Sequence, residues 1–338
     1  MKSNLDLVNE CDVFPYPSTP AHSALLSTLY TLLSPSGVPI GYLTTPVFTA
    51  LAKTPIKTKG ELEVNRSQLT VLAFHQASEP ERSSAVAATV ALWRAQSKFA
   101  VLKGWRDELY PVYGPGNELL FSVERSASCL FGVVTYGVHL MAYTRVPLSD
   151  KEKEKEKEGG KEGGKGLGIK LWVPRRARNK QTYPGMLDNT VAGGMATGET
   201  PLECVIRECE EEASLPEELV RRDVKAHGTV TYCYLRDGRA GGETGLVQPE
   251  CQYIFDLELP PDVVCKPNDS EVEEFFLWDV EEIQERLARG EFKPNCAMVM
   301  LDFFVRWGVL TKENEKDYEE IVRRLHRELE FPGPHRKE

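Results

Sequence analysis

The sequence predicts an α/β protein with two domains, and three observations predict it. Its 338 residues are more than twice the roughly 150 of an average domain. Residues 201–213 have helical periodicity and lie among strand-like segments, an order typical of an α/β domain. These strands are expected at 133–144, 168–173, 226–235 and 250–258. Before residue 125 the segments with a regular hydrophobic pattern are shorter, and some have helical and others strand-like periodicity. This mixture indicates a separate, small α+β domain.

The expected elements follow the chain in order. Upstream, periodicity predicts helices at 21–33 and 81–99 and strands at 39–42, 68–74 and 99–101. Downstream of the strands already named, helices are expected at 280–289, 296–307 and 313–330. Residues 150–166 contain six lysines, six acids and five glycines, so we expect a disordered low-complexity insertion in a hairpin loop. The predicted domains are therefore 1–125, 126–312 and a C-terminal helix and tail at 313–338.

Composition excludes several classes of function. With 41 basic and 51 acidic residues the net charge is −10, which argues against a general binder of nucleic acid or membrane surfaces. No apolar stretch is long enough to span a bilayer. The eight cysteines show no metal-binding spacing, and the first twelve residues are unlike a targeting sequence. We therefore expect a cytoplasmic protein. For its assembly, we expect either a monomer or a homodimer.

The most informative segment is 193–215, GGMATGETPLECVIRECEEEASL. Thr200 and Pro201 suit the start of a helix, as cap and first residue. The expected buried stripe consists of Leu202, Val205, Ile206, Cys209 and Ala213. Glu211 and Glu212 follow Glu208 by three and four residues. On a helix this spacing puts the three carboxylates on one face, where they repel one another. Arg207 can neutralise only one acid, for which we expect Glu199. Carboxylate oxygens converging on a rigid helix suit a hard divalent cation.

An acidic run on a helix is often only a solvated face, but the spacing here is long and fixed. It resembles the Nudix box, G-x5-E-x7-R-E-U-x-E-E-x-G-U, where U is a bulky apolar residue. Two positions depart from the pattern: Ser214 replaces a glycine and Cys209 takes an apolar place. Since Ser214 stands at the helix exit, we expect its cost to be conformational and small.

The resemblance implies a Nudix α/β/α sandwich with a mixed sheet, and hydrolysis of a diphosphate with Mg²⁺ or Mn²⁺. It implies metal binding by Glu208, Glu211, Glu212 and the Gly193 carbonyl. Arg207 would orient a carboxylate and Glu199 would support the loop. The general base stays open between Glu208 or Glu211 and a later acid, for which the candidates are Glu271, Glu273 and Glu274.

A second resemblance covers nearly the whole chain. Segments 104–114, 175–194 and 292–308 look like the eukaryotic thiamin pyrophosphokinase-related Nudix proteins, which carry an N-terminal domain of unknown function. That group implies hydrolysis of thiamin diphosphate, or its damaged oxo and oxy forms, to the monophosphate and phosphate. The chain has no GxxxxGK[ST] loop for ATP, so hydrolysis is preferred to kinase chemistry.

Substrate contacts are expected from a basic cluster and from aromatic residues. Arg175, Arg176, Arg178 and Lys180 could grip a terminal phosphate, or only balance charge at a hairpin tip. Trp105, Tyr110, Tyr113 and Trp172 are candidates for the aromatic wall, or for the core. We expect the pocket where the two domains meet.

Alternative functions share the fold. The nearest is an ADP-ribose or nucleotide-sugar pyrophosphatase, which differs in its pocket. An isopentenyl diphosphate isomerase needs a Cys/Glu acid–base pair that we do not find. A non-catalytic ligand sensor usually loses the box glutamates that this chain keeps.

Overall fold

The computed structural model describes residues 1–17, 19–147 and 167–336. The predicted insertion at 150–166 lies outside these residues. Within them, the N-terminal part has a four-stranded sheet in the order β2-β1-β4-β3 and a hairpin of β5 and β6. Its strands are β1 (Leu29–Leu33), β2 (Pro39–Thr44), β3 (Leu62–Asn65), β4 (Thr70–Ala73), β5 (Leu109–Tyr113) and β6 (Leu119–Glu124). Its helices are α2 (Pro20–Leu26), α3 (Thr45–Lys53), α4 (Ile56–Lys59), α5 (Glu79–Ala95) and α6 (Ser128–Phe131), with short 3-10 helices η1 (Ala100–Gly104), η2 (Pro115–Asn117) and η3 (Arg125–Ala127).

The second part is built on a six-stranded mixed sheet in the order β10-β11-β7-β8-β12, with β9 also paired to β7. Its strands are β7 (Thr135–Pro147), β8 (Leu167–Arg176), β9 (Val191–Gly194), β10 (Lys225–Leu235), β11 (Val247–Glu258) and β12 (Val272–Asp279). The β7–β11 pair is parallel and the other pairs are antiparallel. Antiparallel β7 and β8 confirm the hairpin expected on either side of the insertion.

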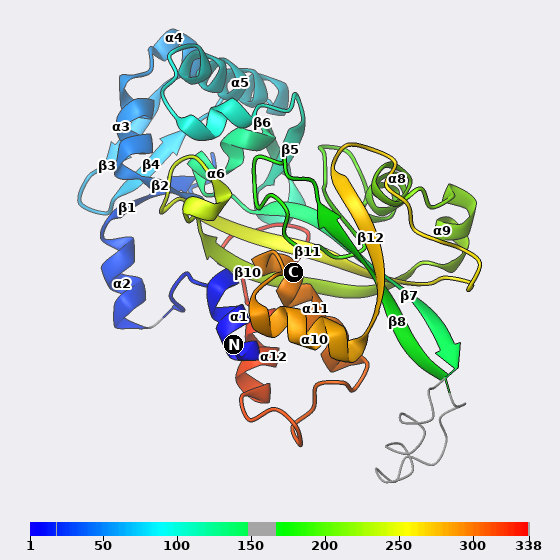
Figure 1. Cartoon of the computed structure of the whole chain (residues 1–338). Coiled ribbons are helices and arrows are strands. Elements are labelled where there is room, and N and C mark those ends of the chain that lie inside the picture. The colour runs from blue at the N-terminus through cyan, green and yellow to red at the C-terminus, as the bar shows by residue number, and fades with distance from the viewer. Residues whose placement is uncertain (18, 148–166, 337–338) are drawn as a thin grey trace.

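Helices cover both faces of this sheet, as Figure 1 shows. They are α1 (Asn4–Cys11), α8 (Pro201–Ala213), α9 (Glu217–Asp223), α10 (Val280–Arg289), α11 (Pro294–Arg306) and α12 (Tyr318–Leu325); η4 (Gly238–Ala240) lies in the β10–β11 loop. Successive residues of β7 alternate between the faces. Leu140 joins the core under α8, whereas Met141 joins the core under α11. The predicted α/β/α sandwich behind a small α+β domain is confirmed.

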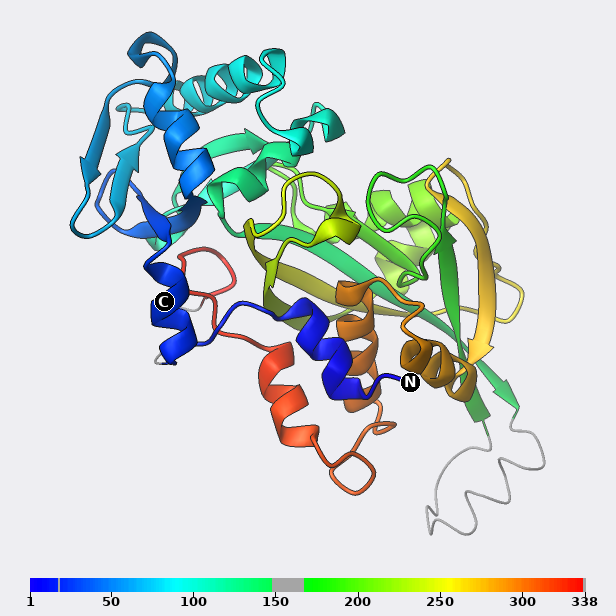
Figure 2. The ribbon, with the colours of Figure 1, turned by 60° about the vertical axis from the view of Figure 1, so that its left-hand side comes forward.

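Helix α1 packs on the second part of the chain, although the N-terminal sheet follows it in sequence. Leu7, Val8 and Cys11 are buried in the core formed by α11 and α12. Figure 2 shows α1 beside both helices. This core therefore crosses the expected division at residue 125, and that division stays a prediction.

Three local predictions were wrong. The helix expected at 21–33 ends at Leu26, and Leu29–Leu33 is a strand because β2 and β4 pair with it on either side. The strand expected at 99–101 is instead the start of η1, and the helix expected at 313–330 is shorter, Tyr318–Leu325. In the described part of the chain, no helix combines the length and apolar character needed to cross a bilayer.

Candidate active site

Helix α8 has the bounds that its local signals predict. Thr200 Oγ1 accepts a hydrogen bond from the Glu203 N–H at 3.3 Å, and Pro201 is the first residue. The helix ends at Ser214, whose left-handed backbone (φ 55°, ψ 31°) is the conformation that favours glycine. The predicted stripe is buried except for Leu202, which is exposed because it lies in the first turn, away from the sheet.

Arg207 connects three of the four predicted acids, which corrects the expectation that it would neutralise only one. Its Nε and Nη2 donate to the two oxygens of Glu199 at 2.9 and 3.2 Å. Nη1 donates to Glu208 Oε1 and Glu211 Oε2, both at 2.9 Å. Although burial opposes it, the hydrogen bonds from Arg207 hold the pKa of Glu199 below its usual value. The guanidinium thus links the loop before the helix to the acidic face.

Glu208 and Glu212 are buried, with 9% and 7% of their surface exposed, whereas Glu211 is exposed. Burial, together with the neighbouring charge of Glu208, raises the pKa of Glu212 to about 8. Burial also raises the pKa of Glu208, against the effect of Arg207. Two adjacent buried carboxylates are costly unless a cation compensates them. Because their ligand atoms are oxygens only, they fit a hard divalent ion such as Mg²⁺ or Mn²⁺.

Glycines 193 and 194 leave room for groups from two directions. A Cβ on Gly193 would lie 2.0 Å from the Glu208 carboxylate, and one on Gly194 would lie 1.6 Å from Tyr110 Oη. Ala192 N–H donates to Glu212 Oε2 at 3.0 Å. Strand β9 therefore contacts the acidic face of α8 and, through Tyr110, the N-terminal part.

The basic cluster pairs with the acids that begin β12. Arg175 contacts Glu274 at 3.4 Å, Arg178 contacts Glu273 at 3.5 Å, and Lys180 binds Glu271. Each later acid proposed as a base is thus held in an ion pair. Burial lowers the pKa of Lys180 to about 8, and its ammonium also feels the charge of Glu212.

Arg176 belongs to the fold rather than to the surface. It is 8% exposed, and Nη1 donates to Asp188 Oδ2 at 2.7 Å. Its other nitrogens donate to the backbone oxygens of Tyr183 and Thr182 at 3.2 and 3.0 Å. Each of its three side-chain nitrogens therefore donates to a group in the loop between β8 and β9.

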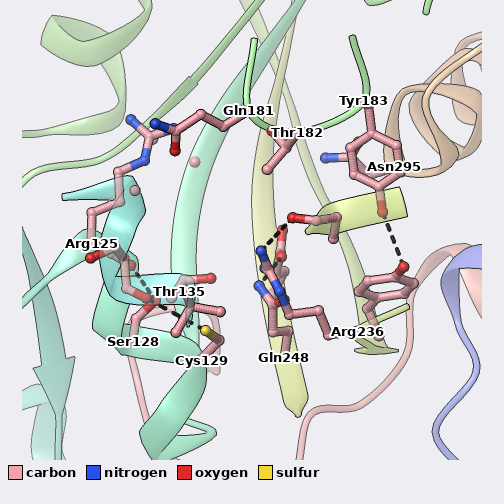
Figure 3. Close-up of a pocket in the computed structure, with 18 of the residues that line it drawn as sticks. Arg125, Ser128, Cys129, Thr135, Gln181, Thr182, Tyr183, Arg236, Gln248 and Asn295 are labelled. Atoms are coloured by element: carbon pink, nitrogen blue, oxygen red, sulfur yellow. Dashed lines mark hydrogen bonds between the residues drawn. The ribbon is translucent and has the colours of Figure 1, made fainter. Parts of the chain in front are cut away.

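A cavity of about 670 Å³ lies where the two parts of the chain meet, as expected. Figure 3 shows Arg125, Ser128 and Cys129 on one side of it and Arg236, Gln248 and Asn295 on the other. Ala192, Gly193 and Gly194 line it next to the acidic face of α8. Of the four aromatic candidates only Tyr110 lines this cavity. Trp105 instead stacks under Arg94 at 4.4 Å and donates to Asp107 at 2.7 Å.

Sequence reasoning missed two groups of lining residues. Arg125 contacts Glu108 at 2.8 Å and lies over the Tyr110 ring, so it brings a cation near Glu208. Gln248, Glu250 and Gln252 line the cavity from β11. For Glu250 and Gln252, the available signal was their alternation in the predicted strand 250–258, whereas Gln248 lay outside that strand and nothing local marked Arg125.

Two known protein families match the two parts of the chain that meet at this cavity. Residues 38–135 match a domain of unknown function, DUF4743, and residues 161–296 match the NUDIX domain. The chain carries a Nudix domain. Its box is the segment 193–215, and the DUF4743 region supplies the wall that contains Arg125 and Tyr110.

The chain spans about half to two thirds of the length of the curated relatives it matches. The chain is 39% identical over 241 residues to "Uncharacterized protein YJR142W" of Saccharomyces cerevisiae, covering 70% of this chain and 65% of that protein. It is 34% identical over 233 residues to "Nudix hydrolase 20, chloroplastic" of Arabidopsis thaliana, covering 67% of this chain and 53% of that protein. The solved structure of DR0079 from Deinococcus radiodurans is 18% identical with a TM-score of 0.38, covering 57% of this chain and 98% of that one.

Proposed function

We propose that the chain is a metal-dependent diphosphate hydrolase of the Nudix type. The observation that carries the proposal is the pair of buried acids, Glu208 and Glu212, beside a cavity large enough for a small-molecule substrate. Glu208, Glu211, Glu212 and the Gly193 carbonyl would hold Mg²⁺ or Mn²⁺. When bound, the metal would neutralise diphosphate oxygens and activate the attacking water. Arg207 orients Glu208 and Glu211, and Glu199 holds Arg207 in place.

The proposed substrate is thiamin diphosphate or its oxo and oxy forms. Water would add to the terminal phosphorus, the bridging P–O bond would break, and the products would be the monophosphate and phosphate. Support comes from the resemblance in segments 104–114, 175–194 and 292–308, and from the cavity at the meeting of the two domains. A deep pocket suits an organic group larger than the diphosphate itself.

Of the predicted substrate-binding residues, Lys180 has the best support, because its ammonium lies close enough to Glu212 to feel its charge. Arg175, Arg176 and Trp105 stay in the proposal as substrate-binding residues, although each of them, like Lys180 with Glu271, also has a protein partner. Arg125 joins the proposal as a contact for the diphosphate, because it lines the cavity near Glu208.

Phosphate release from a small panel tests the proposal. The panel holds thiamin diphosphate, its oxo and oxy forms, ADP-ribose and a nucleotide sugar, each with Mg²⁺ and with Mn²⁺. Monophosphate formed from the thiamin compounds would support the substrate, and loss of that activity in Glu212→Gln would support the site. AMP from ADP-ribose alone would favour the pyrophosphatase alternative. No turnover of any compound would contradict the hydrolase.

We place the protein in a reducing compartment, the cytoplasm, as a monomer or homodimer. All eight cysteines are buried and free, as thiols are in such a compartment. Imaging of a tagged chain and its mass in solution test these two points. Import into a chloroplast, as the name of the Arabidopsis relative states for that protein, would contradict the cytoplasmic placement.

A further inference from the structure

A polar row crosses the floor of the cavity along β11. Gln248, Glu250 and Gln252 alternate along the strand and all line the cavity. The carboxylate of Glu250 accepts three hydrogen bonds. Tyr232 Oη donates at 2.6 Å, Gln252 Nε2 at 2.8 Å and Gln248 Nε2 at 3.4 Å. These neutral donors fix the carboxylate at the surface of the cavity.

Room for this arrangement comes from the neighbouring strand. Gly137 on β7 stands beside Gln252, and a Cβ there would lie 2.3 Å from Gln252 Oε1. Gln252 Nε2 also donates to Tyr232 Oη at 3.2 Å, so the amide contacts both Glu250 and the tyrosine that donates to it. Any larger residue at 137 would displace this amide.

The negative charge of Glu250 has no ion-pair partner within the described residues. The cations that line the cavity are Lys103, Arg106, Arg125, Arg236 and Lys293, and none pairs with it. Arg236, the nearest along the sheet, donates to the backbone oxygens of Gly241 and Ala240 and to Gln248 Oε1. A carboxylate held only by neutral donors leaves its charge available to a ligand.

Among the described residues, the cavity thus offers a carboxylate that no cation pairs with. Arg125 and the glycines beside Glu208 line a wall that suits a diphosphate, and Figure 3 shows Arg125 on the other side of the cavity from Gln248. Glu250 follows Gln248 two residues later on β11 and also lines the cavity. We propose that Glu250 is a specificity-determining residue that receives a cationic heterocycle of the substrate. Tyr232 and Gln252 are its positioning residues. This inference rests on the proposed function only for the position of the diphosphate group of the substrate.

Two thiamin compounds test the charge directly, because the intact thiazolium ring is cationic and the oxo ring is neutral. In Glu250→Gln, kcat/KM for thiamin diphosphate should fall at least tenfold, while that for the oxo form should change less than threefold. Glu258→Gln, the same change on the same strand but outside the cavity, should leave both unchanged. Equal losses for both compounds in Glu250→Gln would overturn the proposal.

Binding of thiamin without phosphate separates this inference from the proposed function. Calorimetry should give a Kd at least tenfold weaker for Glu250→Gln than for the wild type, and an unchanged Kd for Glu258→Gln. This holds whether or not the wild type releases phosphate, so failure of the hydrolase leaves the test intact. Equal Kd values would overturn the role of Glu250. Tyr232→Phe should raise KM several-fold with kcat retained, and an effect on kcat alone would contradict its positioning role.

Discussion

Tyr110 Oη lies 1.6 Å from the point where a Cβ on Gly194 would stand. Tyr110 belongs to β5 of the DUF4743 region, whereas Gly194 ends strand β9 at the start of the Nudix box. The aromatic ring therefore rests on bare backbone beside the acidic face of α8. This contact joins the wall of the cavity to the proposed metal site.

Gly194→Ala should lower both stability and activity, because the new methyl group forces the ring away. Overpacking of this kind costs about 1–3 kcal/mol in the free energy of unfolding. Adding Tyr110→Leu should restore part of the stability, which a double-mutant cycle measures. Gly238→Ala, where a Cβ meets nothing within 4 Å, is the matched control. Strictly additive losses would show that the two residues do not interact.

Glu212→Gln should abolish phosphate release and also raise stability without metal. The folded-state pKa of about 8 lies above the usual 4.5, so the folded protein binds more protons between these values. Metal-free wild type should therefore lose stability as the pH rises from 4.5 to 8, and the variant should lose less. Mg²⁺ should raise the Tm of the wild type only. Glu210→Gln, on the exposed face of α8, should behave as wild type in every assay.

Arg207→Lys should lower activity or metal affinity by about 10- to 100-fold, as loss of a partner that orients metal ligands does. A lysine cannot bind both oxygens of Glu199 and still reach Glu208 and Glu211. Titration of activity against Mg²⁺ measures the effect. Arg221→Lys, which also loses contacts to two glutamates but lies on α9, is the control. Similar losses in both variants would mean that Arg207 acts only on stability.

Ser214→Gly should stabilise the protein by up to about 1 kcal/mol, because glycine adopts the left-handed conformation without strain. The gain is reduced by loss of the hydrogen bond from Ser214 Oγ to the Lys266 carbonyl at 3.0 Å. Urea unfolding of both proteins measures the difference. A loss of stability would show that this hydrogen bond outweighs the backbone strain.

His139 should make the protein sensitive to acid. Burial lowers its pKa to about 4, from an ordinary 6.5, so the unfolded chain binds more protons between these values. Stability should fall as the pH falls through this window, by about 3 kcal/mol from this side chain. His139→Gln, which keeps a donor for Asn189, should flatten the Tm profile there. The remaining slope includes His335, whose pKa burial also lowers to about 4. An unchanged profile would contradict the assignment to His139.

The box could be predicted because its signals are local. Thr200, Pro201 and Ser214 mark the ends of α8 within the sequence itself, and the glutamates need only helical spacing to converge. Residues 29–33 have a helical pattern of leucines, yet pairing with two strands makes them β1. Propensity is weaker than such tertiary contacts.

Partners of charged side chains could not be predicted in the same way. Arg176 looked like part of a phosphate-binding cluster, but Asp188 and two carbonyls hold it in the interior. Glu250 lay in a strand that the sequence predicted, but which face it occupies depends on the register with β10 and β7. The sequence shows whether a segment carries positive or negative charge. Which of those charged side chains a substrate can reach depends on their burial in the fold.

The packing of α1 against α11 must wait until α11 has been synthesised. Leu7 and Val8 are buried against residues that begin at Pro294, roughly 290 positions later, and a ribosome adds about 5–20 residues per second. For some 15–60 seconds after α1 has been made, α11 is not yet present for it to pack against, and the DUF4743 region is synthesised within that interval. Leu7, Val8 and Cys11 have no α11 to pack against during that interval, so closure of this core waits until α11 has been made.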